Sequence, residues 1–304
     1  MNVYDQSARF AAKGDPAGFF RWLLAVPGPS PEFLGWLDTR TLPFPGDPDR
    51  TGDTVAELAD PAESAARWAL ATEFQSEPDP DMLDRLLEYL ARLRRELRHG
   101  PDRRDKYRVV AALVHLTGRR APDTLDMTLP GDPAIGLRLR VVSRSFRDES
   151  AAATLAAIEA GRASRWLLPW IPLMKGARET TIVEHWKTLA TAEPDSRSRA
   201  TFGALALVFV GLTRHAAPWR RGLEGWNMRE SPIVSEWKAE WKAEGKAEGI
   251  HRSILRVLEL RFPGQIPDSL RAAVESQLDE AELSRWLDAA VTAPSLPAFA
   301  ALTR

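Results

Sequence analysis

Alternation of apolar and polar residues in the first half of the chain predicts β-strands. Residues 53–59 alternate in this way, and residues 67–75 are more continuously apolar, as in a buried strand. Residues 79–98 instead carry leucine and methionine at intervals of three and four, which predicts an amphipathic helix. Two further strands are predicted over residues 106–117 and 137–143. This half of the chain is therefore expected to form a sheet with one inserted helix.

Helical patterns occupy both ends of the chain. Residues 3–26 are predicted to form two helices, because Asp15 and Pro16 are typical of a helix start. The pattern becomes helical again from residue 150 to about residue 215. Three amphipathic helices are predicted near the end, over residues 250–262, 267–278 and 280–290. We therefore expect an α/β or α+β core with helical additions, followed by an all-α C-terminal tail.

A four-residue repeat marks the start of the tail. Residues 236–249 read Glu-Trp-Lys-Ala twice and then continue with Glu-Gly-Lys-Ala-Glu-Gly. No glutamate in the repeat lies three or four residues from a lysine, and its two glycines weaken a helix, so we expect a marginal helix or a hinge. The expected domains are residues 1–230 and 231–304, and the tail is expected to mediate self-association or bind a protein partner.

Composition excludes several classes of protein. The chain has 304 residues, of which 44% are hydrophobic and 27% charged, as in ordinary globular proteins. A formal net charge of -1 excludes a uniformly basic coat for nucleic acid but allows a local basic face. The absence of cysteine excludes disulfides, thiolate metal sites and a cysteine nucleophile. Without a long apolar run or a signal-peptide pattern, we expect a cytoplasmic protein with no membrane span.

Three polar residues at the ends of the first two predicted strands are candidates for chemistry. Glu73 and Gln75 are two residues apart on a strand, so their side chains point to the same face. If the two strands are neighbours, Asp53 converges on Glu73. Two close carboxylates repel unless a cation joins them, and oxygen ligands favour Mg²⁺ or Mn²⁺. The alternative is a turn aspartate and a solvent-exposed polar pair.

Several segments carry a resemblance to a known family: Tyr4-Asp5, Arg50-Thr-Gly-Asp53-Thr-Val, Glu73-Phe-Gln75-Ser-Glu-Pro-Asp-Pro-Asp-Met and Arg85-Leu-Leu-Glu-Tyr89. Together they resemble the recombination-promoting nuclease and putative transposase family, within the PD-(D/E)XK nuclease superfamily. The Glu-Gly repeats and Arg261-Phe262 are similar to tails carried by this family. The likeness covers residues 1–117 and, more loosely, residues 236–304.

The resemblance implies an α/β fold with a restriction-endonuclease-like core, which is a mixed central sheet flanked by helices. It also implies metal-dependent hydrolysis of DNA phosphodiesters, in recombination or on mobile or foreign DNA. It implies that Asp53 and Glu73 are ligands of Mg²⁺ or Mn²⁺, with the backbone carbonyl of Phe74 as a third. Gln75 takes the place of the superfamily's lysine. An amide can orient water but cannot carry a positive charge or accept a proton. The chain is therefore either a working variant or a catalytically weakened module that binds DNA or a protein.

The resemblance also implies an acidic residue on the first helix, which is Asp5 or Asp15, with Asp5 preferred for its Tyr-Asp context. Arg85 and Tyr89, one helical turn apart, would face the site and contact phosphate; the alternative is a surface arginine and a core tyrosine. A basic segment over residues 92–108 is either a DNA contact or a solvated helix end. Its candidates for phosphate contact are Arg103, Arg104 and Lys106.

Overall fold

The chain forms two compact units. The computed structural model describes residues 3–25, 30–38, 43–44, 47–51, 54–60, 67–99, 107–118, 122–214, 216–228, 230–234, 247–277 and 279–303. The first unit is Met1–Leu167 with Leu173–Lys175, and the second is Leu168–Pro172 with Gly176–Arg304. The boundary predicted after residue 230 thus falls inside the second unit, because the helices after residue 176 cluster with the tail.

A mixed five-stranded sheet forms the centre of the first unit, as the resemblance implies. Its strands, in spatial order, are β1 (Glu32–Trp36), β4 (Val55–Ala59), β5 (Arg67–Gln75), β6 (Tyr107–His115) and β9 (Val142–Ser145). The β1–β4 and β4–β5 pairs are antiparallel, whereas the β5–β6 and β6–β9 pairs are parallel. A separate small antiparallel pair is formed by β2 (Pro43–Phe44) and β3 (Asp47–Thr51).

Helix α3 (Met82–His99) covers one face of this sheet. It connects β5 to the parallel strand β6, and its apolar stripe packs on the sheet as the leucine spacing predicts. The buried residues of this layer are Val55, Ala69, Ala71, Met82, Leu83, Leu86, Tyr89, Leu90, Leu93, Ala111, Leu113 and Val141. The face of the sheet that carries Ala71 and Leu113 is called the α3 face below.

Helices α1 (Val3–Gly14) and α2 (Pro16–Leu24) confirm the two predicted N-terminal helices. The side chain of Asp15 accepts a hydrogen bond from the Gly18 backbone N–H at 3.0 Å, so Asp15 caps α2. The ring of Phe19 on α2 lies 5.9 Å from that of Phe74 on β5. Because neighbouring residues of a strand point to opposite faces, α2 packs on the face away from α3.

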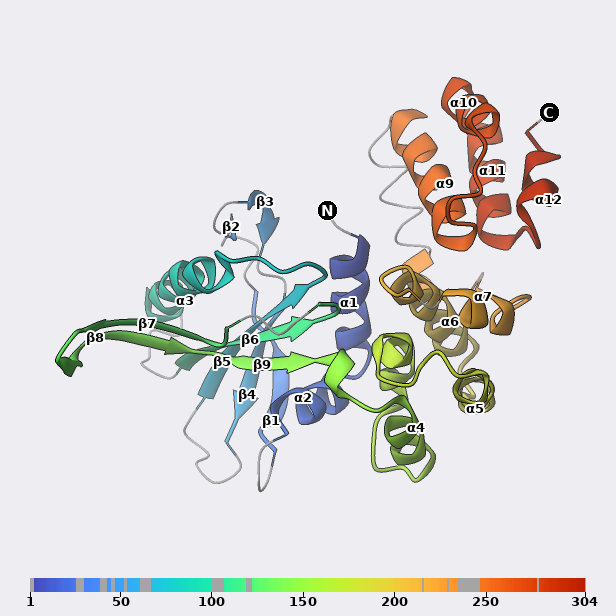
Figure 1. The fold of residues 1–304 in the computed structure, drawn as a ribbon. Coiled ribbons are helices and arrows are strands. Elements are labelled where there is room, and N and C mark those ends of the chain that lie inside the picture. The colour runs from blue at the N-terminus through green and yellow to red at the C-terminus, as the bar shows by residue number, and fades with distance from the viewer. Residues whose placement is uncertain are drawn as a thin grey trace. The chain divides into compact units, whose positions relative to one another are not determined.

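A long two-stranded ribbon lies between β6 and β9 in the sequence and extends away from the sheet (Figure 1). Its strands are β7 (Thr124–Leu129) and β8 (Asp132–Arg140). The prediction of one strand over residues 137–143 is therefore wrong, because β8 ends at Arg140 and β9 begins at Val142. Val141 separates them: its N–H donates to the Asp123 carbonyl at 2.9 Å, and its side chain is buried in the core.

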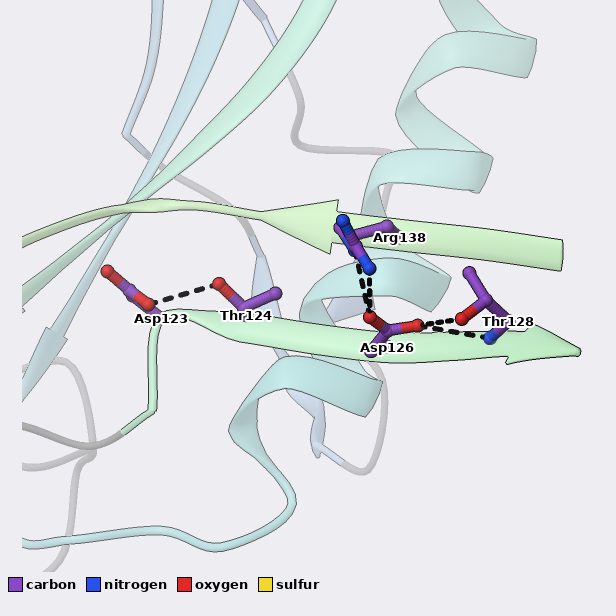
Figure 2. Close-up of polar contacts among 5 residues, drawn as sticks. All are labelled: Asp123, Thr124, Asp126, Thr128 and Arg138. Carbon is purple, nitrogen blue, oxygen red and sulfur yellow. Dashed lines mark hydrogen bonds and ion pairs between the residues drawn. The ribbon is translucent and has the colours of Figure 1, made fainter. Parts of the chain in front are cut away.

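The two faces of the ribbon differ in character. On the polar face, Asp126 accepts hydrogen bonds from the Thr128 hydroxyl at 2.6 Å and from Arg138 Nε at 2.9 Å (Figure 2). The hydrogen bond from the Thr128 side chain, followed by that from Arg138, lowers the pKa of Asp126. On the other face, Leu125 and Leu139 pack against the α3-face core. Asp126 and Arg138 are thus paired with each other within the ribbon.

The first unit continues through the 3₁₀ helix η1 (Phe146–Asp148) and α4 (Ala151–Glu159), and the 3₁₀ helix η2 (Arg165–Leu173) contributes residues to both units. Helices α5 (Thr180–Thr191), α6 (Ser196–Val210) and α7 (Ala216–Gly222) belong to the second unit. Their core is rich in tryptophan: Trp186 and Trp219 are fully buried, with ring centroids 5.6 Å apart. Helices therefore predominate from Ala151 to Val210, in agreement with the helical pattern predicted from residue 150 to about residue 215.

Four helices form the end of the chain: α9 (Ala247–Arg261), α10 (Asp268–Ser276), α11 (Glu280–Thr292) and α12 (Leu296–Ala300). The first three confirm the predicted helices, and α12 is additional. Their apolar faces pack together in one cluster centred on Leu258, Leu283 and Phe299. Residues 235–246, which hold most of the repeat, lie outside the described residues. No helix in the described part of the chain is long and apolar enough to span a membrane.

Candidate functional site

Buried polar residues gather where β5 and β6 end. Glu73 is 3% exposed and Gln75 is 4% exposed, both near the end of β5. Since Ala71 packs against α3, the alternation of side chains places Glu73 and Gln75 on the α3 face. Their burial excludes the alternative of a solvent-exposed polar pair. Glutamate is rarely buried unless its carboxylate is paired with another group. The burial of Glu73 and Gln75 therefore makes the end of β5 more polar than the apolar core around it.

The side-chain amide of Gln75 is the most unusual polar group of this site. Both Oε1 and Nε2 are buried, and neither has a hydrogen-bond partner among the residues that the structure describes. A buried amide without partners costs free energy, so such groups in native proteins normally contact water, an ion or a ligand. The Gln75 amide therefore points to a small polar species at the end of β5.

The start of β4 is joined to β5 beside Glu73. Val55 pairs with Ala71 in the antiparallel register, and the Thr72 N–H donates to the Thr54 carbonyl at 2.9 Å. The Thr54 hydroxyl donates to the Thr72 carbonyl at 2.8 Å, which closes this end of the pair. Asp53 comes directly before Thr54 in the sequence and lies outside the described residues.

The direction of the Phe74 carbonyl follows from its neighbours. The Gln75 carbonyl accepts a hydrogen bond from the Leu116 N–H at 2.8 Å, on the β6 side, whereas Thr72 bonds to Thr54 on the β4 side. Backbone groups of successive residues in a strand point to opposite neighbours, so the Phe74 carbonyl is directed to the β4 side. This is the side on which Thr54 and the start of β4 lie.

His115 is a residue of this site that sequence reasoning missed. It is 2% exposed and lies directly opposite Gln75 in the β5–β6 register, so its side chain is on the α3 face. Its Nε2 lies 3.2 Å from the hydroxyl of Ser143 on β9. The one available signal was its place near the end of a predicted strand, because the pairing that brings it beside Gln75 is not visible in the sequence.

The two candidate acids near the N-terminus have different surroundings. Asp5 is buried on α1, and its Oδ2 forms an ion pair with Arg9 Nη2 at 2.9 Å. Asp15 caps α2 through the Gly18 N–H, as described above. The structure thus gives Asp15 a local structural role, whereas Asp5 belongs to a buried ion pair whose cation sequence reasoning missed. The spacing of four residues between Asp5 and Arg9 is the signal that would have indicated this pair.

The predicted DNA contacts are spread along α3 and the segment that follows it. Arg85 is half-buried in the first turns and forms an ion pair with Asp79. Tyr89 is 1% exposed and packs in the core of the α3 face. Arg103, Arg104 and Lys106 lie outside the described residues. Tyr107, which follows them, pairs with Arg67, at the opposite end of β5 from Gln75.

The oxygen atoms at the end of β5 fit a hard divalent cation. The Glu73 carboxylate, the Phe74 carbonyl and the Gln75 amide oxygen are the types of ligand that Mg²⁺ and Mn²⁺ accept. Within the described ranges, no group of three or more acidic or histidine side chains is close enough to hold a metal ion. A complete site at this position therefore requires Asp53 or another ligand in addition to Glu73.

Comparisons with known proteins identified no relative of this chain. A scan against protein-family models, a search of curated proteins and a search of solved structures each gave no match for this chain. The likeness to the recombination-promoting nuclease family thus rests on the short segments of this sequence alone.

Proposed function

We propose that this protein is a metal-dependent DNA endonuclease whose site lies at the end of β5. The observation that carries the proposal is the buried amide of Gln75, which has no hydrogen-bond partner in the described structure and lies two residues from the buried carboxylate of Glu73. A hydrated cation beside this strand end would give the Gln75 amide hydrogen-bonding partners and would lie close to the Glu73 carboxylate.

Each residue of the proposed site has a distinct role. Asp53 precedes Val55 by two positions and Glu73 follows Ala71 by two, so the β4–β5 register supports a pairing of the two carboxylates. With the Phe74 carbonyl they would hold the metal. A bound Mg²⁺ or Mn²⁺ ion lowers the pKa of a coordinated water and offsets the charge of a phosphodiester. Gln75 would orient the attacking water, since its amide both donates and accepts hydrogen bonds.

The order of elements supports the same proposal. An N-terminal helical segment is followed by three antiparallel strands, a crossover helix and a parallel strand. This is compatible with the restriction-endonuclease-like core that the resemblance implies, with the candidate site at the carboxyl ends of β5 and β6. A fold does not establish an activity, so the proposal rests on the site residues.

Among the proposed DNA contacts, Arg85 lies in the first turns of α3. Arg85 is close in sequence to the site. It would contact DNA if its ion pair with Asp79 were replaced by one with a backbone phosphate. The tail remains the proposed surface for self-association or a protein partner. Since α9–α12 bury their apolar faces in their own cluster, Trp237 and Trp241 of the repeat are better candidates for that contact.

Nicking of supercoiled plasmid tests the proposed function. We expect the full chain to nick plasmid with Mg²⁺ or Mn²⁺ and to lose this activity in EDTA. The double variant Asp53→Ala, Glu73→Ala should be inactive, because it lacks both carboxylates of the proposed site. Equal nicking by the wild type and the double variant would place the activity elsewhere or identify a contaminant.

A second candidate function is a DNA- or protein-binding module of the same fold. The observation in its favour is Gln75 itself, because an amide cannot supply the charge or proton transfer of a lysine. A wild type that binds DNA in a mobility-shift assay, with the same affinity in Mg²⁺ and EDTA and without nicking, would support this function instead.

Replacing Gln75 with lysine is expected to increase the rate of nicking about 10-fold or more. The ammonium group would be placed beside Glu73 and would stabilise charge that develops on the phosphate, an effect worth about 100- to 1,000-fold for one optimally placed group. Initial rates of plasmid nicking measure this. Gln75→Met, which keeps the size but removes the amide, is the matched control and should be slower than the wild type. A lysine variant no faster than the methionine variant would contradict the assignment of Gln75.

A further inference from the structure

The second unit contains a cavity that the proposed nuclease site does not use. Its volume is about 520 Å³, within the range typical of small-molecule sites. Trp226 and Met228 line it after α7, and Arg261 and Phe262 line it at the end of α9. The lining of the cavity therefore combines aromatic and cationic side chains.

Two walls of the cavity are held in place by other parts of the unit. The Trp226 indole N–H donates to the Arg199 carbonyl at 3.0 Å, and its ring packs so closely on Gly203 that a Cβ there would lie 2.4 Å from it. The guanidinium of Arg261 donates to the Ala293 carbonyl at 2.6 Å, just beyond the end of α11. Arg261 thus caps the C-terminal end of α11, and its guanidinium is occupied by this contact.

Arg220, on α7, does not cap a helix in this way. Within the described residues it forms no hydrogen bond and no ion pair, and its Nε is buried. Burial lowers the pKa of Arg220, while the negative charge of Glu259 acts in the opposite direction. The Glu259 carboxylate itself accepts a hydrogen bond from the Gly264 N–H at 2.8 Å. Arg220 is therefore a half-buried cation with no hydrogen-bonded acid among the described residues.

We propose that this cavity binds a small organic anion, with its oxyanion on Arg220 and its apolar body between Trp226 and Phe262. A guanidinium matches the geometry of carboxylate and phosphate groups, and an anion would replace the water that Arg220 loses on burial. Arg221 adds a second cation to the lining, against one acidic residue, Glu224. The apolar and aromatic walls favour an anion with an aryl or alkyl group over a free inorganic ion.

Titration calorimetry of the full chain tests this proposal. The probes are phenyl phosphate, benzoate, inorganic phosphate and neutral phenol. We expect at least one aryl anion to bind at least 10-fold more tightly than inorganic phosphate or phenol. The comparison of phenyl phosphate with benzoate decides between a phosphate and a carboxylate ligand. Arg220→Gln should weaken binding at least 10-fold, whereas Arg214→Gln, at an exposed position that does not line the cavity, should leave binding unchanged.

Thermal unfolding separates a ligand-binding role of Arg220 from a structural one. Because Arg220 forms no hydrogen bond or ion pair with the described residues and would lose only the attraction of Glu259, Arg220→Gln should unfold close to the temperature of the wild type without ligand. The aryl anion should raise the unfolding temperature of the wild type alone. No binding of any anion to the wild type, equal binding by both proteins, or a lower unfolding temperature of the unliganded variant would each overturn the proposal. None of these outcomes depends on nuclease activity.

Discussion

Replacing Glu73 with glutamine is expected to slow metal-dependent nicking about 100- to 1,000-fold or more, the usual loss when one preorganised electrostatic group is removed. Glu73 is buried at the end of β5, beside the unpartnered amide of Gln75, so its carboxylate would face a bound cation rather than solvent. The substitution keeps the size of the side chain but removes the negative charge that a metal ligand needs. Rates of plasmid nicking at saturating Mg²⁺ measure the effect.

Thermal unfolding with Mn²⁺ supplies a second readout that does not depend on catalysis. A metal at about 100 times its dissociation constant stabilises the folded state by about 2.7 kcal/mol. The wild type should show this stabilisation, and Glu73→Gln should lose most of it. Glu77→Gln, at an exposed position just after β5, is the matched control and should behave as the wild type. If both variants kept the metal response, Glu73 would not be a ligand.

Replacing Trp186 with alanine is expected to destabilise the second unit by about 3–5 kcal/mol, the usual cost of removing a large buried aromatic side chain. Trp186 is fully buried on α5, and its ring lies 5.6 Å from that of Trp219 and 5.3 Å from that of Trp226. Its indole N–H donates to the Leu168 carbonyl at 2.8 Å. Loss of the ring would leave both a cavity and an unpaired carbonyl. Urea unfolding, followed by far-UV circular dichroism, measures the change.

Trp186→Phe separates these two contributions. Phenylalanine keeps much of the ring but cannot donate to the Leu168 carbonyl, so we expect a smaller loss of about 1–3 kcal/mol. Trp68→Phe is a control in the first unit, where the ring is half-buried and contacts Arg108. A loss below about 1 kcal/mol for Trp186→Ala would show that the surrounding helices collapse into the space.

Much of the first unit was predictable because its signals are local. The strand predicted over residues 67–75 is β5, with the same bounds, since its apolar run is bounded by polar segments. The Asp15-Pro16 pair located the start of α2, because capping depends on residues within one turn. The three predicted tail helices, which belong to the second unit, were predictable from amphipathic spacing, which is also a local signal. The candidate pair Glu73 and Gln75 came from strand periodicity alone.

The sequence pattern did not predict the β7–β8 ribbon, because apolar side chains of its strands are exposed instead of buried in a core. Residues 124–129 alternate, but Met127 and Leu129 are about half exposed, at 47% and 52%, so the apolar positions do not mark a core strand. The turn at Pro130 and Gly131, where Gly131 has a φ of 91°, was the remaining signal of a hairpin. Without the ribbon, residues 137–143 read as one strand.

The sequence by itself determined which residues form β5, α2, α3 and the tail helices, and that Glu73 and Gln75 share a face. Only the tertiary structure decided that this face is covered by α3 and that His115 lies opposite Gln75. It alone also showed that the Gln75 amide is buried and has no hydrogen-bond partner in the described part of the chain. The physical reason is separation along the chain. Periodicity and capping act over a few residues, whereas burial and strand pairing depend on segments 20 to 40 residues away, as with Gln75 and His115.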